Sequence, residues 1–483
     1  MGQCDCVVVG AGLSGLAAGI RLAHFGRGVL ICERHVQTGG LNSRYLRGGF
    51  EIDTGLHAMT NFVPKTGAKS SPLLKLLRQL RIPYDALELR EQKKSKISFP
   101  QAELEFSNDF ELLISEIKRA FPKEMDAFLA FDRFVAEYDA LDLKAPPRSA
   151  RAAAAEYLRD PVLTDMLFAP LSYYGSAVEN DMELGQFAIM YRSVFREGFC
   201  RPAAGIGVLL SLLEKRFEEC GGKILRGKRA NDGFDASSPA LLLGNGARRV
   251  LTENGKVVGV ELDSGRVVEC PVVLSSAGYH ETMELAGAPV PGEDSSDPPG
   301  RLGFLEAIAL FDDPIPALDD GHAIIFFNRS ERFHYERPEN AVDFNSGVVC
   351  SPRAFHFEEG DEPPPPSLRA TLLANPRKWE AMSREEYASA KTAVAEKALE
   401  NAAETARLDG GLPQAVLTDC FTPLTIKRFT GKLNGAIYGT PGKRKDGATP
   451  VEGLFICGTD QGFLGITGSM LSGISMANGH ALR

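Results

Sequence analysis

A glycine-rich turn near the start of the chain has the spacing that holds a phosphate group. It reads Gly10-Ala11-Gly12-Leu13-Ser14-Gly15, after a short apolar run and before apolar residues at helical spacing. Gly10 permits a tight turn, Gly12 lets the backbone approach a pyrophosphate, and Gly15 lets the helix pack closely on the strand. The amides at the start of that helix then point at the phosphate. Residues 10–15 are therefore predicted to bind a dinucleotide, the alternative being an ordinary tight turn.

A carboxylate follows the second predicted strand, at the position expected in a dinucleotide-binding site. The next predicted strand, residues 28–32, is followed by Glu33 and Arg34, about twenty residues after the glycines. A carboxylate at this position accepts hydrogen bonds from both hydroxyls of an adenosine ribose and favours an unphosphorylated ribose. We expect both residues to contact the nucleotide, but Glu33 alone does not separate NAD from FAD.

The next two segments favour FAD over NAD. Residues 38–44 (Thr-Gly-Gly-Leu-Asn-Ser-Arg) and 49–55 (Gly-Phe-Glu-Ile-Asp-Thr-Gly) resemble the second glycine signature of the FAD-dependent amine oxidase and phytoene desaturase superfamily. The resemblance implies cofactor contacts from Gly39, Gly40, Leu41, Asn42, Gly55 and Leu56, with the paired glycines along the pyrophosphate and ribityl chain. His57 falls where members bring the chain near the isoalloxazine ring, so it is a candidate catalytic acid–base group or a hydrogen-bond partner.

A further flavin segment lies near the C-terminus. An apolar run ends at Gly458, Thr459 and Asp460, and Gly465-Ile466-Thr467-Gly468 opens a predicted helix. A helix N-terminus stabilises the negative charge of a reduced flavin. The segment resembles the C-terminal flavin motif of the family, which implies cofactor contacts from Gly458, Asp460, Ile466 and Thr467. Members commonly have an acid directly after the strand-end glycine, whereas this chain has Thr459 there and Asp460 one place later.

The middle of the chain supplies a third segment. Residues 202–207 (Pro-Ala-Ala-Gly-Ile-Gly) resemble the proline-glycine entry to a helix in the same family. Residues 248–274 are typical of a β-meander, with its third strand expected at residues 272–274. The resemblance implies that the backbone at Val250 meets adenine and that Ala277 lies near the dinucleotide. Residues 227–247, rich in Gly, Ser, Asn and Asp, are expected to form a surface loop.

Together these segments predict an α/β fold with interleaved domains. Residues 1–63, 203–280 and 440–483 are expected to form a Rossmann-like FAD-binding domain of the amine oxidase type. Residues 64–202 and 281–439 are then left for an α+β substrate-binding domain. We expect FAD to be bound non-covalently, because no cysteine lies in the turn that opens the last helix, and we expect no metal site.

Aromatic residues of the predicted inserted domain are candidates for a substrate cavity. Residues 168–191 and 435–439 resemble segments of carotenoid desaturases and isomerases. The candidate lining residues are Tyr173, Tyr174, Phe187, Tyr191, Phe327 and Tyr438. Aromatic residues at helical spacing are also typical of an ordinary core, which is the alternative.

The resemblance implies an oxidoreductase that desaturates, saturates or isomerises carbon–carbon bonds of an apolar, isoprenoid-like polyene. The chain shows no second glycine-rich Rossmann unit, which favours oxygen or a quinone as electron acceptor over a built-in NAD(P)H site. Amine oxidation and the tailoring of another natural product are alternatives within enzymes. The alternative outside enzymes is a non-catalytic prenyl-binding escort protein, although the intact glycines and Glu33 argue against it.

Composition excludes other classes and sets the expected location. A net charge of -9 without a long basic run gives no footprint for nucleic acid. The start of the chain has no secretory pattern, so we expect a cytoplasmic protein, and without an apolar run of ~18 residues any membrane contact would be peripheral. Residues 71–81, with leucines on one face and bases on the other, are either a helix for that contact or an ordinary domain helix. The nine scattered cysteines indicate reduced thiols.

Overall fold

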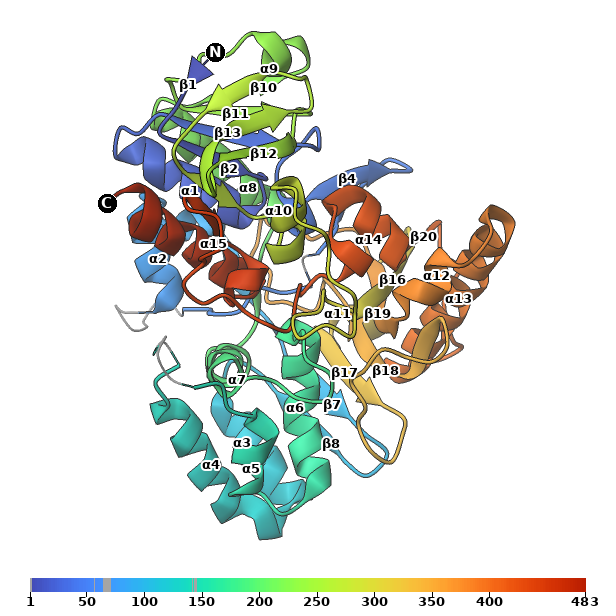
Figure 1. Ribbon diagram of the computed structural model, residues 1–483. Coiled ribbons are helices and arrows are strands. Elements are labelled where there is room, and N and C mark those ends of the chain that lie inside the picture. The colour runs from blue at the N-terminus through green and yellow to red at the C-terminus, as the bar shows by residue number, and fades with distance from the viewer. Residues whose placement is uncertain (1, 56, 64–70, 141, 143–145) are drawn as a thin grey trace.

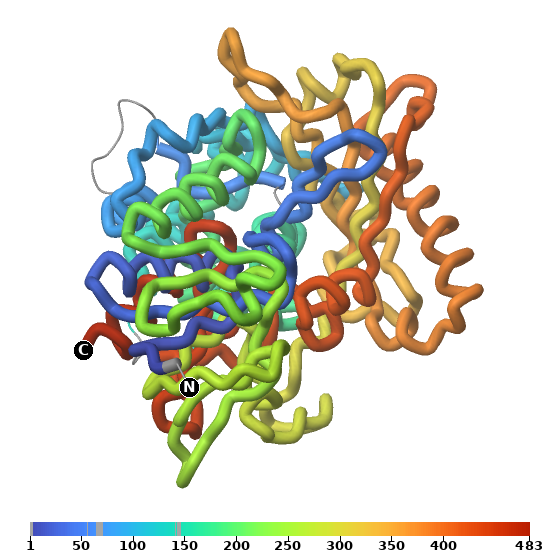
Figure 2. Tube along the Cα trace, turned by 90° about the horizontal axis from the view of Figure 1, so that it is seen from above, coloured from blue at the N-terminus to red at the C-terminus, as the bar shows by residue number. Residues whose placement is uncertain are grey.

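The computed structural model describes residues 2–55, 57–63, 71–140, 142 and 146–483. The upper part of Figure 1 holds a six-stranded sheet and both ends of the chain, and a seven-stranded sheet lies below and beside it. Seen from above in Figure 2, the blue N-terminal, green middle and red C-terminal segments interweave in one body, while an orange segment lies apart at one side. The chain therefore leaves the first sheet and returns to it more than once.

All pairings in the six-stranded sheet are parallel. In spatial order its strands are β10 (Lys223–Arg226), β11 (Ala240–Leu243), β3 (Val29–Glu33), β2 (Cys6–Val9), β15 (Val273–Ser275) and β21 (Leu454–Ile456). The inner strands are buried on both faces, as their nearly continuous apolar sequences require.

Helices cover one face of this sheet and a second, smaller sheet covers the other. The helices are α1 (Leu13–His24), α8 (Ile206–Glu219) and α15 (Gly465–Met476). The small sheet has the order β1 (Gly2–Gln3), β14 (Val267–Glu269), β13 (Lys256–Leu262) and β12 (Ala247–Glu253). This arrangement is a Rossmann-like α/β fold, as predicted.

Two expectations for the middle of the chain were wrong. Residues 227–247 are not simply a surface loop, because they contain α9 (Lys228–Asp232) and the buried strand β11, which pairs with β3. The apolar run Ala240–Leu243 is the reason, since it completes the core beside β3. The third strand of the meander is β14, whereas β15 belongs to the parallel sheet.

The seven-stranded sheet is mixed. Its order is β20 (Leu417–Phe421), β16 (Gly303–Leu310), β19 (Ser367–Ala374), β18 (Val342–Cys350), β17 (Ile324–Asn328), β7 (Ser95–Ser98) and β8 (Glu103–Phe106), with β17 and β7 parallel and the other neighbours antiparallel. One face packs on α13 (Arg384–Thr405), and the other contributes to the core that contains α6 (Pro161–Gly175) and α7 (Leu184–Tyr191). Because side chains alternate along a strand, each strand contributes side chains to both cores.

Shorter elements lie around the six-stranded and seven-stranded sheets. The lower helices in Figure 1 include α3 (Phe110–Ala120), α4 (Met125–Glu137) and α5 (Ala150–Ala155). The segments beside the seven-stranded sheet or between the bodies include α10 (Tyr279–Leu285), α11 (Pro316–Asp319), α12 (Pro376–Glu380) and α14 (Pro423–Thr430). Two small ribbons pair β4 (Arg44–Arg47) with β5 (Phe50–Asp53) and β6 (Leu89–Glu91) with β9 (Cys200–Pro202).

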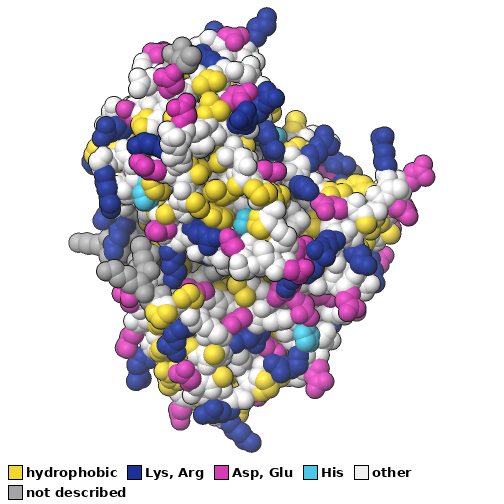
Figure 3. All heavy atoms as spheres, viewed as in Figure 1, with side chains coloured by type: hydrophobic (Ala, Val, Ile, Leu, Met, Phe, Trp, Pro, Cys, Tyr) yellow, Lys and Arg dark blue, Asp and Glu magenta, His cyan; other side chains and the backbone are white. Residues whose placement is uncertain are grey.

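Helix α2 (Pro72–Leu80) turns its leucines inward. Leu73, Leu76, Leu77 and Leu80 are at most 1% exposed and belong to the core that contains α1. This face is therefore not available to a bilayer, and residues 72–80 form an ordinary domain helix. No helix in the described ranges is long and apolar enough to cross a membrane. On the face drawn in Figure 3, basic and acidic side chains are intermixed.

Candidate functional site

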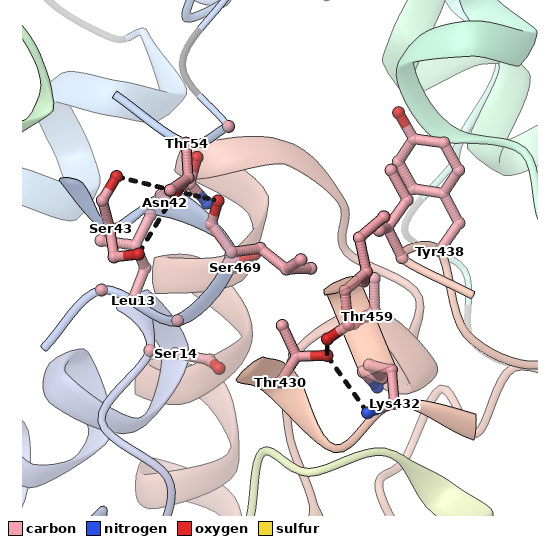
Figure 4. Close-up of a pocket in the computed structure, with 18 of the residues that line it drawn as sticks. Leu13, Ser14, Asn42, Ser43, Thr54, Thr430, Lys432, Tyr438, Thr459 and Ser469 are labelled. Carbon is pink, nitrogen blue, oxygen red and sulfur yellow. Dashed lines mark hydrogen bonds between the residues drawn. The ribbon is translucent and has the colours of Figure 1, made fainter. Parts of the chain in front are cut away.

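A large cavity receives side chains and backbone from both sheets. Its volume is about 1490 Å³, which exceeds the ~300–1,000 Å³ of typical small-molecule sites. It extends from Glu33, at the carboxyl end of β3 in the parallel sheet, to Phe304 on β16. Figure 4 shows its middle, with Asn42, Ser43 and Thr54 on one side and Tyr438 on the other.

Two glycine segments touch each other in the wall of this cavity. Gly12 and Gly39 form a parallel bridge, and the Gly39 amide donates to the Ala11 carbonyl at 2.9 Å. Gly39 and Gly40 have φ values of 109° and 57°, in the left-handed region that favours glycine. A Cβ added at Gly40 would lie 3.3 Å from the Gly12 Cα atom. The wall is thus bare backbone where a phosphate would approach the start of α1.

Close packing around α1 sets the direction of this turn. A Cβ at Gly15 would lie 1.9 Å from the Gly10 carbonyl oxygen, and one at Gly473 of α15 would lie 2.0 Å from the Ser14 carbonyl oxygen. Gly10, Leu13 and Ser14 line the cavity, whereas Gly15 lies behind them against the turn. Gly15 and Gly473 therefore act through packing.

Glu33 is held in place by backbone amides at the nucleotide end. Its two carboxylate oxygens accept the amides of Ala11 and His35, each at 2.7 Å. A carboxylate has about four acceptor positions, so Glu33 keeps capacity for a ribose. Arg34 and Ala277 line the same end of the cavity. Val250 does not reach the cavity, because it is buried between the two sheets of the nucleotide body. The start of the same strand lines the cavity instead, through Ala247 and Arg248.

The start of α15 forms the opposite wall. Ile466 and Thr467 line the cavity, with Leu41, Asn42 and Gly55 among the residues facing it from the second glycine segment. The first amides of a helix have no partner within the helix, so α15 offers donors to a ligand. Gly458 lines the cavity next to these residues. Leu56, a further predicted contact, lies outside the described residues.

Asp460 does not have the geometry expected of a cofactor contact. It is 1% exposed, and its carboxylate accepts the backbone amides of Tyr279 at 2.7 Å and Thr440 at 2.9 Å. Lys443 Nζ lies 3.6 Å from the same carboxylate. Burial raises the pKa of Asp460, but the nearby lysines and the two amides outweigh it and hold the pKa below its ordinary value. The side chain therefore ties two loops together, and Thr459 lines the cavity in its place.

The far end of the cavity is aromatic. Tyr173 and Tyr174 of α6 line it, together with Phe304 and Tyr438. The Phe304 ring lies 6.3 Å from the Tyr173 ring and 5.6 Å from the Tyr438 ring, measured between centroids. The Tyr438 hydroxyl donates to the Tyr173 carbonyl, and the Tyr173 hydroxyl is bonded to Ser346 at 2.9 Å. We call Tyr173, Tyr174, Phe304 and Tyr438 the aromatic chamber.

Three other predicted lining residues lie in the core. Phe187 and Tyr191 of α7 are fully buried, pack on Phe131 and Phe168 among others, and are absent from the cavity wall. Phe327 packs with α13 on the other face of the seven-stranded sheet. Alternation along β17 explains this placement, because its neighbour Phe326 takes the face toward α6 and Phe327 must point away.

His57 reaches a buried ion pair in the cavity wall. Its Nε2 atom lies 3.0 Å from Glu306 Oε1, which accepts Arg369 Nε at 2.6 Å. Arg369 Nη2 also donates to the Asp53 and Thr54 carbonyls at 2.9 and 3.1 Å. Burial raises the pKa of Glu306, but Arg369 and His57 outweigh it and hold the pKa below its ordinary value. The imidazole is therefore held by a carboxylate between the second glycine segment and the aromatic chamber.

Sequence reasoning missed the residues that hold His57. Glu306 is a lone carboxylate in the buried strand Gly303–Leu310, and Arg369 lies in the buried strand Ser367–Ala374. A charge inside such an apolar run is a detectable signal, because an isolated buried charge is costly and implies a partner. Phe304, two residues before Glu306 and on the same face of β16, leaves no such signal.

The wall contains polar atoms that suit a polar ligand. Four buried side-chain atoms that line the cavity have no hydrogen-bond partner within the described residues: Tyr174 OH, Thr371 Oγ1, Lys432 Nζ and Thr467 Oγ1. Buried polar groups are normally satisfied, so these atoms, with the bare glycine wall, fit a dinucleotide. All nine cysteines are free thiols, and no described cluster of His, Cys, Asp and Glu has the composition of a metal site.

A parallel sheet with a glycine-rich turn, joined to a mixed sheet across one cavity, is the arrangement of a dinucleotide-binding protein with a second domain over the cofactor. The chain belongs to the family of flavin-containing amine oxidoreductases, whose family model matches residues 13–479. It is thus a member of a flavin-dependent family, as its glycine signatures predict.

Known proteins agree with this assignment. The chain is 23% identical to prolycopene isomerase 2 of an Oncidium hybrid cultivar, over 94% of this chain and 79% of the relative. It is 25% identical to human all-trans-retinol 13,14-reductase, over 58% of this chain and 48% of that protein. Among solved structures, an oxidoreductase from Methanosarcina mazei has a TM-score of 0.62 at 17% identity, with 98% of this chain and 100% of that chain covered. The structural likeness supports the fold.

Proposed function

We propose that this protein binds FAD non-covalently and desaturates, saturates or isomerises carbon–carbon bonds of an apolar, isoprenoid-like polyene. The observation that carries the proposal is the continuity of the cavity, in which the glycine wall of Gly12 and Gly40 leads to the aromatic chamber. The names of two relatives, prolycopene isomerase and all-trans-retinol 13,14-reductase, point the same way.

Different residues of the cavity would bind different parts of FAD. Glu33 would hold the adenosine ribose, the bare backbone at Gly12, Gly39 and Gly40 would admit the diphosphate, and α15 would direct amides and the Thr467 hydroxyl at the flavin. When bound, FAD supplies electron and hydride transfer. The aromatic chamber would exclude water and orient an apolar chain.

His57 is the proposed acid–base group. The Glu306 carboxylate accepts Arg369 Nε and lies 3.0 Å from His57 Nε2, so the buried ion pair orients the imidazole. A positioned imidazole can give or take a proton next to the reacting bond. Oxygen or a quinone as electron acceptor, and a cytoplasmic location, stay predictions.

Amine oxidation is the alternative within enzymes. Recognition of a cationic amine calls for a free carboxylate or an aromatic cage. The cavity carboxylates of Glu306 and Asp419 are paired with Arg369 and Arg47, but Glu197 also lines the cavity, with the Asn61 amide as its partner. The charges of the wall therefore do not separate the two branches, and it is the names of the relatives that favour the polyene. A non-catalytic escort protein has no need of the cofactor cradle between Gly12 and Gly40.

The cofactor proposal is tested on purified protein. We expect the visible absorption of oxidised flavin, either as isolated or after FAD is added, and we expect heating to release intact FAD. Protein that stays colourless after reconstitution would remove both enzyme hypotheses and favour the escort alternative.

The substrate class is tested anaerobically. The bound flavin is photoreduced in one sample and left oxidised in another, and each is mixed with an acyclic polyene or with an aliphatic amine. We expect the polyene to change the redox state of the flavin or to return as an isomer, and the amine to do neither. Bleaching of the oxidised flavin by the amine alone would overturn the choice of branch.

A further inference from the structure

Lys432 is a buried cation that the proposed roles leave unused. It lies two residues after α14, is 5% exposed and lines the cavity. Its Nζ atom has no hydrogen-bond partner in the part of the chain that the structure describes. Burial of an ammonium group is unfavourable unless an anion compensates it. The position therefore calls for an anionic ligand.

The placement of Lys432 indicates which part of a cofactor it would meet. A Cβ at Gly278, three residues after β15, would lie 2.6 Å from Lys432 Nζ. Figure 4 shows Lys432 beside Thr430 and Thr459, across the cavity from Ser43. Lys432 thus stands near the carboxyl ends of β15 and β21, where ligands of parallel sheets bind.

The start of α1 lies against the same edge of the sheet. A Cβ at Gly458, directly after the β21 strand end and Cys457, would lie 3.0 Å from Ser14 Oγ. Anions bind at helix N-termini because the free amides and the helix dipole favour negative charge. A diphosphate at the start of α1 would therefore have Lys432 on its other side.

The acids around Lys432 have other partners. Glu281 accepts the Leu433 amide at 2.8 Å, and Asp460 holds the Tyr279 and Thr440 amides. Burial raises the pKa of Glu281 and the charge of Lys432 opposes that rise, yet neither carboxylate accepts a hydrogen bond from Lys432 Nζ among the described contacts. The protein thus supplies nearby charge for Lys432 without a direct partner.

We propose that Lys432 binds the diphosphate of the cofactor and offsets its charge from the side opposite α1. The inference rests on the proposed FAD site and adds a residue that no glycine signature contains. A charge-assisted bond to phosphate is stronger than a neutral one, and a lysine provides it as a point charge. The bond would also remove the cost of the buried ammonium.

The test separates the diphosphate from the flavin ring. FAD, ADP and riboflavin are titrated against flavin-free full-length protein, as wild type and as Lys432→Met. We expect the dissociation constants of FAD and ADP to rise about tenfold or more in the variant, and that of riboflavin to stay unchanged. Lys427→Met is the matched control, because Lys427 pairs with Glu380 at 2.7 Å on the surface, and we expect it to change none of the three.

The thermal midpoint of the flavin-free protein gives a second readout. Because Lys432 also offsets the buried charges of Asp460 and Glu281, the Lys432→Met variant should have a somewhat lower midpoint than the wild type, together with the loss of ADP affinity. Lys432→Arg keeps the charge and should retain part of the ADP affinity, which provides a test if the Met variant does not fold.

Several results would overturn the inference. Unchanged FAD and ADP affinities, or a loss of riboflavin affinity alone, would remove Lys432 from the diphosphate. A lower midpoint in the flavin-free variant with unchanged affinities would assign Lys432 a structural role beside Glu281. A wild type that binds neither FAD nor ADP would overturn the proposed function itself, whereas a wild type that binds both while Lys432→Met binds equally well would overturn only the inference.

Discussion

The two ends of the cavity are built from different parts of the chain. At the cofactor end the wall is backbone, where Gly12 bridges Gly39 and Gly40 approaches within contact distance of Gly12. At the substrate end the wall is side chains, where Tyr438 donates to a Tyr173 carbonyl 265 residues away and both rings face Phe304. The first wall leaves a local glycine pattern in the sequence, and the second leaves none.

Because the two walls are built differently, they should respond to different kinds of substitution. A side chain added at Gly12 takes space from the ligand with no protein atom nearer than 4.0 Å, whereas one at Gly39 or Gly40 would also strain the backbone. A side chain removed near the aromatic chamber acts on the ligand only if it faces the cavity, and otherwise acts on the core. The four changes below test that division, in order of decreasing effect.

Gly12→Val should strongly weaken FAD binding. Gly12 has φ −69° and ψ 178°, which valine adopts, and a Cβ there would have the Gly39 carbonyl oxygen at 4.0 Å as its nearest atom. We therefore expect a thermal midpoint of the flavin-free protein close to wild type and a loss of FAD affinity of about a thousandfold, or ~4.1 kcal/mol. Fluorescence titration measures the affinity, with Gly292→Val in open space as the control. Retained FAD affinity would contradict the backbone wall.

Phe187→Ala should act on stability alone. Phe187 is fully buried, with its ring 4.6 Å from that of Phe168. Loss of a buried phenylalanine costs about 3–5 kcal/mol, so denaturant unfolding should show a large decrease in stability while FAD affinity and turnover per folded molecule stay unchanged. If turnover fell without a change in stability, Phe187 would belong to the cavity after all.

His57→Gln should lower turnover by about a hundredfold, the low end for loss of a general acid–base group. Glutamine keeps a polar group beside Glu306, so the flavin spectrum and the thermal midpoint should stay near those of the wild type. Steady-state kinetics measures the effect on kcat. Wild-type kcat in the variant would reduce His57 to a hydrogen-bond partner.

The Glu306 carboxylate predicts a small acid sensitivity. Its folded-state pKa is below the ordinary value, because Arg369 and His57 outweigh the effect of burial. A depressed pKa contributes stability above the unfolded pKa of ~4.3, and that stability is lost as the pH falls through the folded-state pKa. We expect a loss of about 1 kcal/mol in wild type below pH ~4, measured by unfolding at stepped pH. Glu306→Gln should lack this component, and an identical pH profile in the variant would exclude Glu306 as its source.

The features that could be predicted from the sequence are those set by the local backbone. The Rossmann-like fold and the flavin-dependent family are confirmed, because glycines at fixed spacing, strand ends and helix starts are local features. The strand at Ala240–Leu243 was missed because polar and glycine residues around it resemble a loop. Asp460 was expected to contact the cofactor, and its carboxylate instead accepts two loop amides, since a strand end in sequence does not reveal whether a carboxylate faces the ligand or a neighbouring loop.

Side-chain placement was harder to predict. Tyr173, Tyr174 and Tyr438 lie in the cavity wall, whereas Phe187, Tyr191 and Phe327 have the same chemistry and lie in the core. Only the register of β17 and the packing of α7 separate the two groups, and neither is visible in composition. His57, Glu306 and Arg369 come from three separate segments, so their contact required the folded chain.

A flavin difference spectrum shows whether the cofactor cradle and the aromatic chamber share one working cavity. An acyclic polyene is added without oxygen to the FAD-loaded protein, and the absorption of the bound flavin is followed. We predict a change that saturates at one polyene per FAD and that persists in Phe187→Ala. A flavin spectrum that does not change when the polyene is added, or that changes only with an aliphatic amine, would contradict a polyene site beside the flavin.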